Sequence, residues 1–239
     1  MKKIFILFLV LIIYNCNKET SLEFEETAIE KNDPVSVEVI YPRLIDESDI
    51  SQKINIMIES TLAEQIAFFD EDAGSISLDD AVTQFENRFI SFKNDFEEDA
   101  TPWEVTINSE VIFQSLYVIT IAIDSYTFTG GAHENSVISF LNFDPMTGNL
   151  YSQEDLFNKA SEFSELIKQH FKTELESKGI NDSENFYLGD DFKLPENIGF
   201  NEEGVIFLYN SYEMMSFAQG ITEFTVPYNE ISKYLKINY

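Results

Sequence analysis

Two glycines and a histidine form the most distinctive short group of residues in this sequence. Gly130 and Gly131 stand just before His133, between two segments in which apolar residues alternate. Glycine readily adopts positive φ, so the pair predicts a sharp turn that displays the imidazole at the end of two strands. Loops at strand ends often carry recognition residues. The residue types therefore allow three roles for His133: a hydrogen bond across the bend, ligand binding, or general base catalysis.

Catalysis would need further groups, and the sequence offers few. It lacks a G-x-S-x-G nucleophile motif, and two histidines with one cysteine cannot form a histidine-rich metal cluster. The second histidine, His170, falls on the apolar face of an expected helix, which is typical of a core or boundary residue. The acidic runs at 70–72 and 97–99 lack the ligand spacing of an EF-hand loop, so we expect solvated helix ends there. The sequence thus predicts no cofactor and no metal, and it favours binding over catalysis.

The N-terminus has the pattern of an exported lipoprotein. Lys2 and Lys3 precede an unbroken apolar run from Ile4 to Ile13, and Cys16 follows. The run is too short for a membrane-spanning helix of about 20 residues. This order resembles the lipobox of bacterial lipoproteins, in the looser form found in the Bacteroidetes. We expect a signal peptide over 1–15 and a lipid on Cys16, which would hold the protein on the periplasmic or cell-surface face of the outer membrane; the alternative is ordinary signal cleavage.

The charge of the chain limits its partners. The 43 acidic and 15 basic residues give a formal net charge of −28. Nucleic acid and bare anionic membrane are poor partners for such a chain. Strong acidity commonly means a solvated surface, and it also attracts cationic proteins or divalent ions. The many phenylalanine and tyrosine residues predict a packed core rather than disorder.

The first half of the mature chain reads as a tether followed by a strand and two helices. Residues 16–33 are charged and lack a sustained apolar face, which predicts a flexible tether. Alternating valines predict a strand over 35–41, and apolar residues at helical spacing predict a helix over 50–69. A second helix begins after Ser77 and carries a phenylalanine stripe that ends at Phe96. We expect this stripe to face the core rather than a cofactor.

The pattern changes to period two after Trp103. We expect a strand, a turn at Asn108-Ser109, further strand structure up to Phe128, and a continuation of the sheet over 136–144. The later elements are a turn at 145–148, a short helix capped by Ser152 and Asp155, a helix over 161–178, short strands around Glu203-Gly204, an irregular segment over 211–220, a strand into Val226 and a helical turn after Pro227. Grouped helices and antiparallel strands predict an α+β fold with two small subdomains.

Two long stretches resemble a known family. They are "TFTGGAHENSVISFLNFDPMTGNLYSQEDLF" and "GVIFLYNSYEMMSFAQGITEFTVPYNEISKYL". Both are similar to the domain of unknown function that RsiV-type anti-sigma factors share with PdaC-type peptidoglycan deacetylases, and the preceding segment resembles its companion domain. The resemblance implies a companion domain over 34–128 and an RsiV-like domain over 129–239. It also implies a candidate ligand-binding group, which consists of Gly130, Gly131, His133, Tyr212 and Glu213.

The resemblance and the charge together predict a function. The anti-sigma role would need a cytoplasmic sigma-binding part, and only three residues precede the apolar run. The deacetylase branch uses a separate metal-dependent domain, for which this sequence has no counterpart. One RsiV-type branch recognises lysozyme. We therefore expect a lipid-anchored cell-envelope protein that binds a cationic lysozyme-type protein or peptidoglycan. Alternatives are a glycan hydrolase or deacetylase-associated enzyme using His133, and a structural lipoprotein without a ligand; the oligomeric state is left open.

Overall fold

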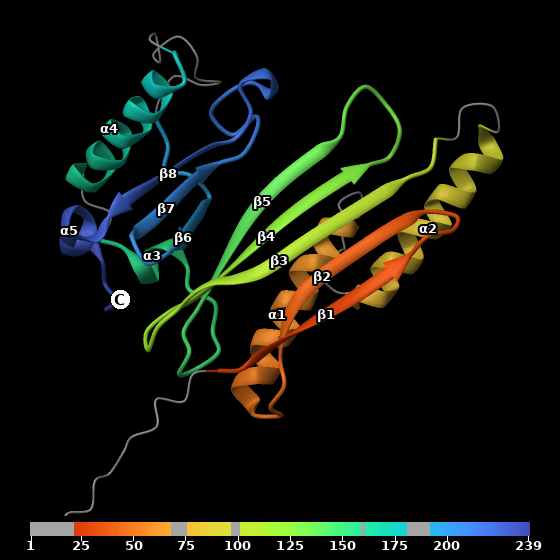
Figure 1. Ribbon diagram of the computed structural model, residues 1–239, viewed down its shortest axis with the longest axis horizontal. Helices are drawn as coiled ribbons and strands as arrows, with labels where there is room; N and C mark the ends of the chain where they lie inside the picture. The colour runs from red at the N-terminus through yellow and green to blue at the C-terminus, as the bar shows by residue number, and fades with distance from the viewer. Residues whose placement is uncertain (1–21, 68–75, 97–100, 159–160, 181–191) are drawn as a thin grey trace, which may run out of the picture.

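Two β-sheets organise the chain, with helices on their outer faces (Figure 1). The structure is a computed structural model that describes residues 22–67, 76–96, 101–158, 161–180 and 192–239. The predicted signal peptide, Cys16 and the two acidic runs lie outside these ranges. The mixture of helices with two antiparallel-rich sheets confirms the predicted α+β class.

The larger sheet contains five strands in the order β1-β2-β3-β4-β5. The strands are β1 Phe24–Lys31, β2 Ser36–Leu44, β3 Glu104–Gln114, β4 Ile119–Phe128 and β5 Asn135–Phe143. All neighbours are antiparallel except β2 and β3, which are parallel. Parallel strands need a long crossover connection. Here the helices α1 (Asp49–Ile66) and α2 (Leu78–Asp95) provide it.

The two helices cover one face of the larger sheet and form the first core with it. The N-cap side chain of Ser77 accepts a hydrogen bond from Asp80 N, as its sequence pattern predicts. Phe85 and Phe89 of α2 are buried, and their ring centroids lie 5.5 and 5.8 Å from that of Trp103. Burying each such ring stabilises the fold by about 1.5–3 kcal/mol. The predicted core stripe does not extend to Phe96, which is exposed because α2 ends one residue earlier.

The tether predicted over residues 16–33 extends too far toward the C-terminus, because part of this range is a strand. Residues 24–31 form β1, which pairs with β2 along its whole length. Phe24 and Ile29 pack against the first core, while Glu25, Glu26 and Glu30 are exposed. An edge strand that carries many charges has a weak apolar signal, and pairing with β2 decides its structure.

The predicted turn at Asn108-Ser109 is wrong, because β3 runs straight through it. Ser109 is buried and its hydroxyl lies 3.4 Å from the carbonyl oxygen of Ile40. The turn comes later, where Ser115 N donates to Val118 O. β4 pairs with β5 beyond it, so the predicted domain boundary at 128/129 falls between two strands of one sheet.

The second sheet has three antiparallel strands in the order β6-β7-β8. They are β6 Asn197–Phe200, β7 Gly204–Tyr209 and β8 Thr222–Pro227. The accompanying helices are α3 Gln153–Leu156, α4 Ser161–Ser177, the 3-10 turn Phe217–Gln219, α5 Tyr228–Ile231 and the 3-10 turn Ser232–Tyr234. As predicted, Ser152 and Asp155 form a capping box at α3, and Gly179 adopts positive φ after α4. The apolar face of α4 packs on this sheet to form the second core.

A buried polar joint connects the two sheets. Thr120 Oγ1 donates to Asn142 Oδ1 at 2.8 Å, and Asn142 Nδ2 donates to the carbonyl oxygen of Ile198 at 2.6 Å. Phe200 N donates to Thr120 Oγ1 at 3.3 Å. Thr120 and Asn142 belong to β4 and β5, whereas the other two residues belong to β6. Each buried polar group of the joint therefore has a hydrogen-bond partner, either on the neighbouring strand or on the other sheet.

Candidate functional site

The Gly130-Gly131 pair forms the sharp turn that its sequence predicts. The two glycines have φ of 80° and 122° in the hairpin loop between β4 and β5. His133 follows in the same loop, and its Nδ1 lies 2.8 Å from the carbonyl oxygen of Glu134. The imidazole therefore pairs with the neighbouring residue and does not hydrogen-bond across the bend.

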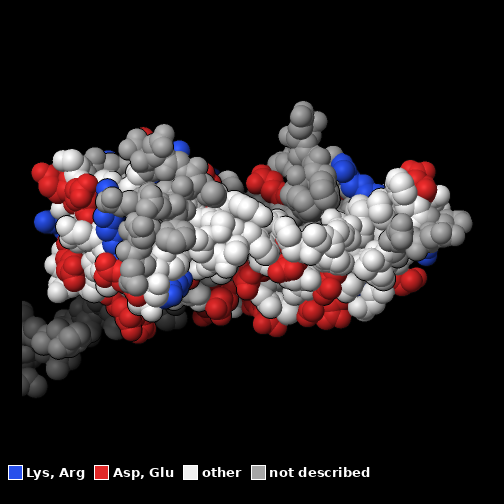
Figure 2. Space-filling model, turned by 90° about the horizontal axis from the view of Figure 1, so that it is seen from above, with Lys and Arg blue, Asp and Glu red and all other residues white. Residues whose placement is uncertain are grey.

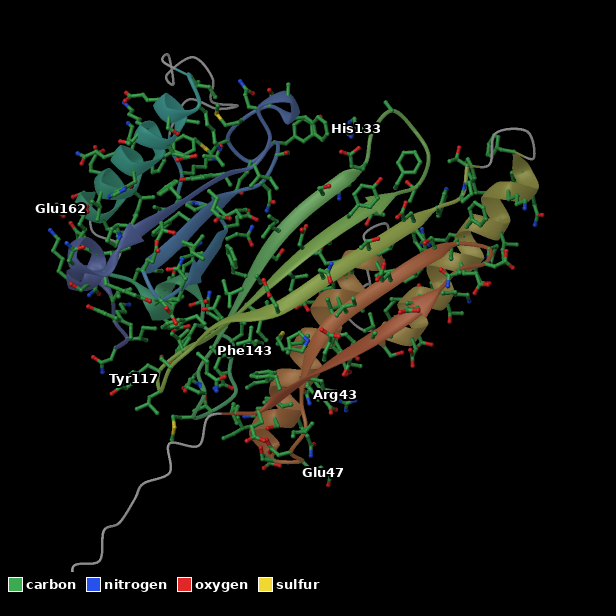
Figure 3. All side chains as sticks on the ribbon, in the orientation of Figure 1. Arg43, Glu47, Tyr117, His133, Phe143 and Glu162 are labelled. Carbon is green, nitrogen blue, oxygen red and sulfur yellow. The ribbon has the colours of Figure 1, made fainter. Side chains whose placement is uncertain are left out.

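The His133 ring belongs to a group of three stacked rings, which we call the aromatic clasp. The His133 and Phe217 ring centroids are 4.3 Å apart, with 27° between the planes. Tyr212 stacks on Phe217 at 5.8 Å and 29°. Figure 3 shows His133 beside the segment that joins β7 to β8. The clasp thus brings two candidate residues, His133 and Tyr212, into one cluster through a residue that the sequence did not single out.

Glu213 braces the loop that carries Tyr212. Its carboxylate accepts hydrogen bonds from Glu196 N at 2.7 Å and Asn210 N at 3.0 Å. Burial raises the pKa of Glu213 above its ordinary value, although these two hydrogen bonds oppose the rise. Tyr212 itself is 58 % exposed and has φ of 70°, which is uncommon outside glycine. The Glu213 carboxylate is therefore already hydrogen-bonded to backbone N–H groups, and the exposed Tyr212 ring is the group that a ligand can contact.

His170 contacts different residues from those around His133. Its Nε2 lies 3.1 Å from Glu230 Oε2, and its ring stacks on Phe224. This arrangement agrees with the prediction of a boundary histidine with a satisfied hydrogen bond. The two histidines share no partner among the described side chains.

A cleft of about 650 Å³ lies between the uncovered face of the larger sheet and the smaller sheet. We call it the intersheet cleft. Its lining residues come from all five strands of the larger sheet and from the β6–β8 sheet: Glu26, Ile40, Asn108, Ser109, Glu110, Ile112, Ala122, Asp124, Ile138, Phe140, Asn201, Ile206 and Glu223. A volume of 300–1,000 Å³ is usual for ligand pockets. His133 of the hairpin loop is not among the residues that line this cleft.

The described residues that line the intersheet cleft include four acidic side chains and neither Lys nor Arg. Its carboxylates are those of Glu26, Glu110, Asp124 and Glu223. Burial raises the pKa of Glu223, while the nearby Lys178 opposes that rise. Figure 2 shows acidic side chains gathered along the side of the molecule that faces the viewer in Figure 1. The cleft therefore suits a ligand that carries positive charge.

Strand alternation explains why these residues line the cleft. In β3, Val105 and Ile107 are buried under the helices, so Asn108 and Glu110 point to the opposite face. Asn108 pairs with Asp124 in register, which places the Asp124 carboxylate on the same face. These polar positions at period two were visible in the sequence. The wrongly predicted turn at Asn108 hid them, because it broke the register of the strand.

The described residues show neither a metal site nor a membrane span. No group of three or more His, Cys, Asp or Glu side chains within the described ranges could hold a metal ion. No helix among them is both long and apolar enough to cross a bilayer.

Comparisons with known families and structures agree with this architecture. The family model "Deacetylase PdaC" matches residues 29–136, and the model "Protein of unknown function (DUF3298)" matches residues 154–229. The two models match in tandem, a PdaC-type region before a DUF3298 region, which confirms the predicted resemblance. No curated protein matches the chain.

Two solved structures share the fold. A DUF3298 family protein from Pseudomonas aeruginosa PAO1 has a TM-score of 0.66 and 19 % identity, over 90 % of this chain and 95 % of that chain. A DUF3298 family member from Bacteroides fragilis NCTC 9343 has a TM-score of 0.63 and 18 % identity, over 90 % and 94 % of the two chains. Both likenesses concern the fold of nearly the whole chain.

Proposed function

We propose that this protein is a lipid-anchored binding protein of the cell envelope that captures a basic protein of the lysozyme type at the intersheet cleft. The observation that carries the proposal is the lining of the cleft, where four carboxylates meet without a basic side chain. The family supports it as well, because the resemblance includes a branch that recognises lysozyme.

The chemistry of the cleft favours a long cationic side chain as the inserted group. Ile138 and Phe140 from β5 and Ile206 from β7 give the cleft an apolar part beside its carboxylates. Lysine and arginine have apolar stems and charged heads, so the stem can lie along these residues while the head reaches a carboxylate. The net charge of −28 adds a long-range attraction that raises the rate of encounter with a basic protein.

A hydrolase that uses His133 receives less support from the geometry. The described contacts of its ring are a backbone carbonyl oxygen and the Phe217 ring. No described hydroxyl or thiol hydrogen-bonds to the imidazole as an activated nucleophile would. His133 also lies outside the lining of the intersheet cleft. Binding is therefore the function that the arrangement supports best.

Calorimetry with lysozyme tests the proposal. The chain from residue 17 onward contains every described residue and is titrated at low salt and near 0.15 M salt, where screening acts over about 8 Å. The variant Glu110→Gln/Asp124→Asn removes two charges from the cleft. The matched control, Glu162→Gln/Glu176→Gln, removes two exposed charges from α4.

The expected result is measurable binding at both salt concentrations, and a loss of about tenfold or more for the cleft variant that the control does not share. Equal losses in the two variants would show that only overall charge matters. Absence of binding near 0.15 M salt would favour a structural lipoprotein without a ligand.

The lipid anchor has its own test. Cells that express the wild-type chain are grown with a fatty-acid probe, alongside cells that express Cys16→Ser. We expect the probe to mark the wild type alone. Equal labelling of both chains, or labelling of neither, would contradict the anchor without affecting the proposal for the cleft.

A further inference from the structure

Exposed apolar side chains gather at one end of the molecule, which we call the hairpin end. It consists of the tip of the β3–β4 hairpin, the turn after β5 and the residues just before α1. Five of the eleven exposed large apolar side chains in the described ranges are here: Ile45 (53 % exposed), Leu116 (53 %), Tyr117 (43 %), Met146 (73 %) and Leu150 (40 %). Single exposed apolar residues are ordinary, whereas a group of them marks an interaction surface.

Hydrogen bonds hold the parts of the hairpin end together. Tyr151 Oη donates to the carbonyl oxygen of Tyr117 at 3.2 Å, which links the turn after β5 to the hairpin tip. Lys53 Nζ donates to the carbonyl oxygen of Thr147 at 3.4 Å, which links the same turn to α1. Figure 3 shows Tyr117 and Glu47 at the same, lower end of the molecule. The apolar side chains therefore belong to one surface.

The N-terminal part of the chain enters the fold at this end. Gln114, the last residue of β3, donates from Nε2 to the carbonyl oxygen of Leu22 at 3.2 Å. Cys16 lies six residues before Leu22. Six residues span about 20 Å at most, so a lipid on Cys16 would keep the hairpin end within that distance of the membrane.

The opposite end of the sheet is much farther from the anchor. β3 has 11 residues, which span about 35 Å at the usual rise per residue. Ile90 lies near the end of α2, whose neighbouring residues Phe89 and Phe92 pack on Trp103, just before β3 begins. Ile90 is 40 % exposed, so it matches the hairpin residues in exposure but not in position.

We infer that the hairpin end is a membrane-apposed surface whose apolar side chains enter the boundary between headgroups and acyl chains. The inference rests on the proposed lipid at Cys16. Leucine and methionine gain by leaving water at that depth, and the tyrosine ring suits the interface because its hydroxyl stays hydrated. Asp46 and Glu47 beside Ile45 oppose approach to anionic lipid. The contact is therefore apolar, and a zwitterionic surface is the membrane that it fits.

Site-directed spin labelling of the lipidated chain tests the inference. Cys16 is the only cysteine and its sulfur would be blocked by the lipid, so Met146→Cys supplies a single free thiol for a nitroxide. Ile90→Cys is the matched control. Each labelled lipoprotein is placed in phosphatidylcholine vesicles, and the collision rates of the nitroxide with oxygen and with a water-soluble nickel chelate are measured. The same labels on the unlipidated Cys16→Ser chain give the values in solution.

Membrane insertion is expected to lower the nickel collision rate at position 146 several-fold and to raise the oxygen rate, while position 90 changes little. An unchanged nickel rate at position 146 in vesicle-bound lipoprotein would overturn the inference. A low nickel rate already present in the unlipidated chain would overturn it too, because a second copy of the protein would then cover this surface. Failure of the anchor shows separately, as absence of the wild-type chain from the vesicles.

Discussion

Removing the Asn142 side chain should weaken both sheets at once. The substitution Asn142→Ala leaves the Thr120 hydroxyl without its acceptor and the Ile198 carbonyl without the Asn142 donor, both in a buried setting. Each buried polar group that loses its partner costs about 1–3 kcal/mol. We therefore expect the free energy of unfolding to fall by about 2–5 kcal/mol. For a chain of this size, that corresponds to a fall in Tm of about 4–20 °C.

Urea unfolding followed by two signals measures this loss. Trp103 is the only tryptophan and packs against Phe85 and Phe89, so its fluorescence reports on the first core. Far-ultraviolet circular dichroism reports on both sheets. Asn87→Ala on the exposed side of α2 is the control, and it should change stability by no more than about 0.5 kcal/mol.

The two signals should shift together in Asn142→Ala if the polar joint couples the sheets. A midpoint equal to that of the Asn87→Ala control would show that the joint contributes nothing. A shift in circular dichroism without a shift in Trp103 fluorescence would show that the sheets unfold independently, and the reasoning about the joint would be wrong.

Four further variants probe the glycines, His133 and the cleft. Gly131→Val should lower Tm more than His133→Ala in thermal melts. A φ of 122° strains a branched residue by about 1–3 kcal/mol, whereas His133 is exposed. The reverse order would show that the His133–Phe217 stack contributes more to stability than the glycine turn does. Gly204→Ala should prevent normal folding, since an added Cβ would lie 2.1 Å from the carbonyl oxygen of Val226; a wild-type circular dichroism melt would contradict this. Partial desolvation raises the pKa of Glu223 above its ordinary value although the residue is exposed, so the charged form is disfavoured in the folded state and stability is lost as pH rises through that raised pKa. Glu223→Gln should therefore gain stability relative to wild type in melts at about pH 7 but not at about pH 4, and an equal difference at both pH values would speak against burial as the cause.

Helices and turns with a strong local signal were predictable from the sequence. The apolar spacing of α1, α2 and α4 needs no knowledge of the rest of the fold, and neither do the caps at Ser77 and Ser152. The Gly130-Gly131 turn was predictable for the same reason, because positive φ is a local property of glycine.

The features that depend on distant residues were not predictable in this way. Strand β1 carries many charges and is ordered by its pairing with β2, so its own residues resemble a tether. Asn108 and Ser109 favour turns locally, yet pairing with Ile40 and Asp124 keeps them in a strand. The intersheet cleft needs the relative placement of both sheets, which no single segment of the sequence encodes.

The aromatic clasp shows the same limit within the candidate group. His133 and Tyr212 meet through Phe217, which lies near Tyr212 in the sequence but far from His133. The role of Glu213 as a brace also depends on a distant residue, because one of its two donors is Glu196 N. The sequence could point to these side chains, whereas their contacts required the folded chain.

The parallel pairing of β2 with β3 has a consequence for how the chain folds. Residues 36–40 pair with residues 104–108, so this contact closes a long loop that contains α1 and α2. Contacts between residues far apart in sequence form slowly, because the entropy of closing the loop is lost before the contact stabilises anything. The β1–β2 hairpin and the two helices precede β3 in the chain, so they emerge first during synthesis, while the apolar face of β2 still lacks its neighbour β3. A chaperone that binds unfolded chains would bind this segment. We expect it to release the segment only after β3 and β4 have emerged.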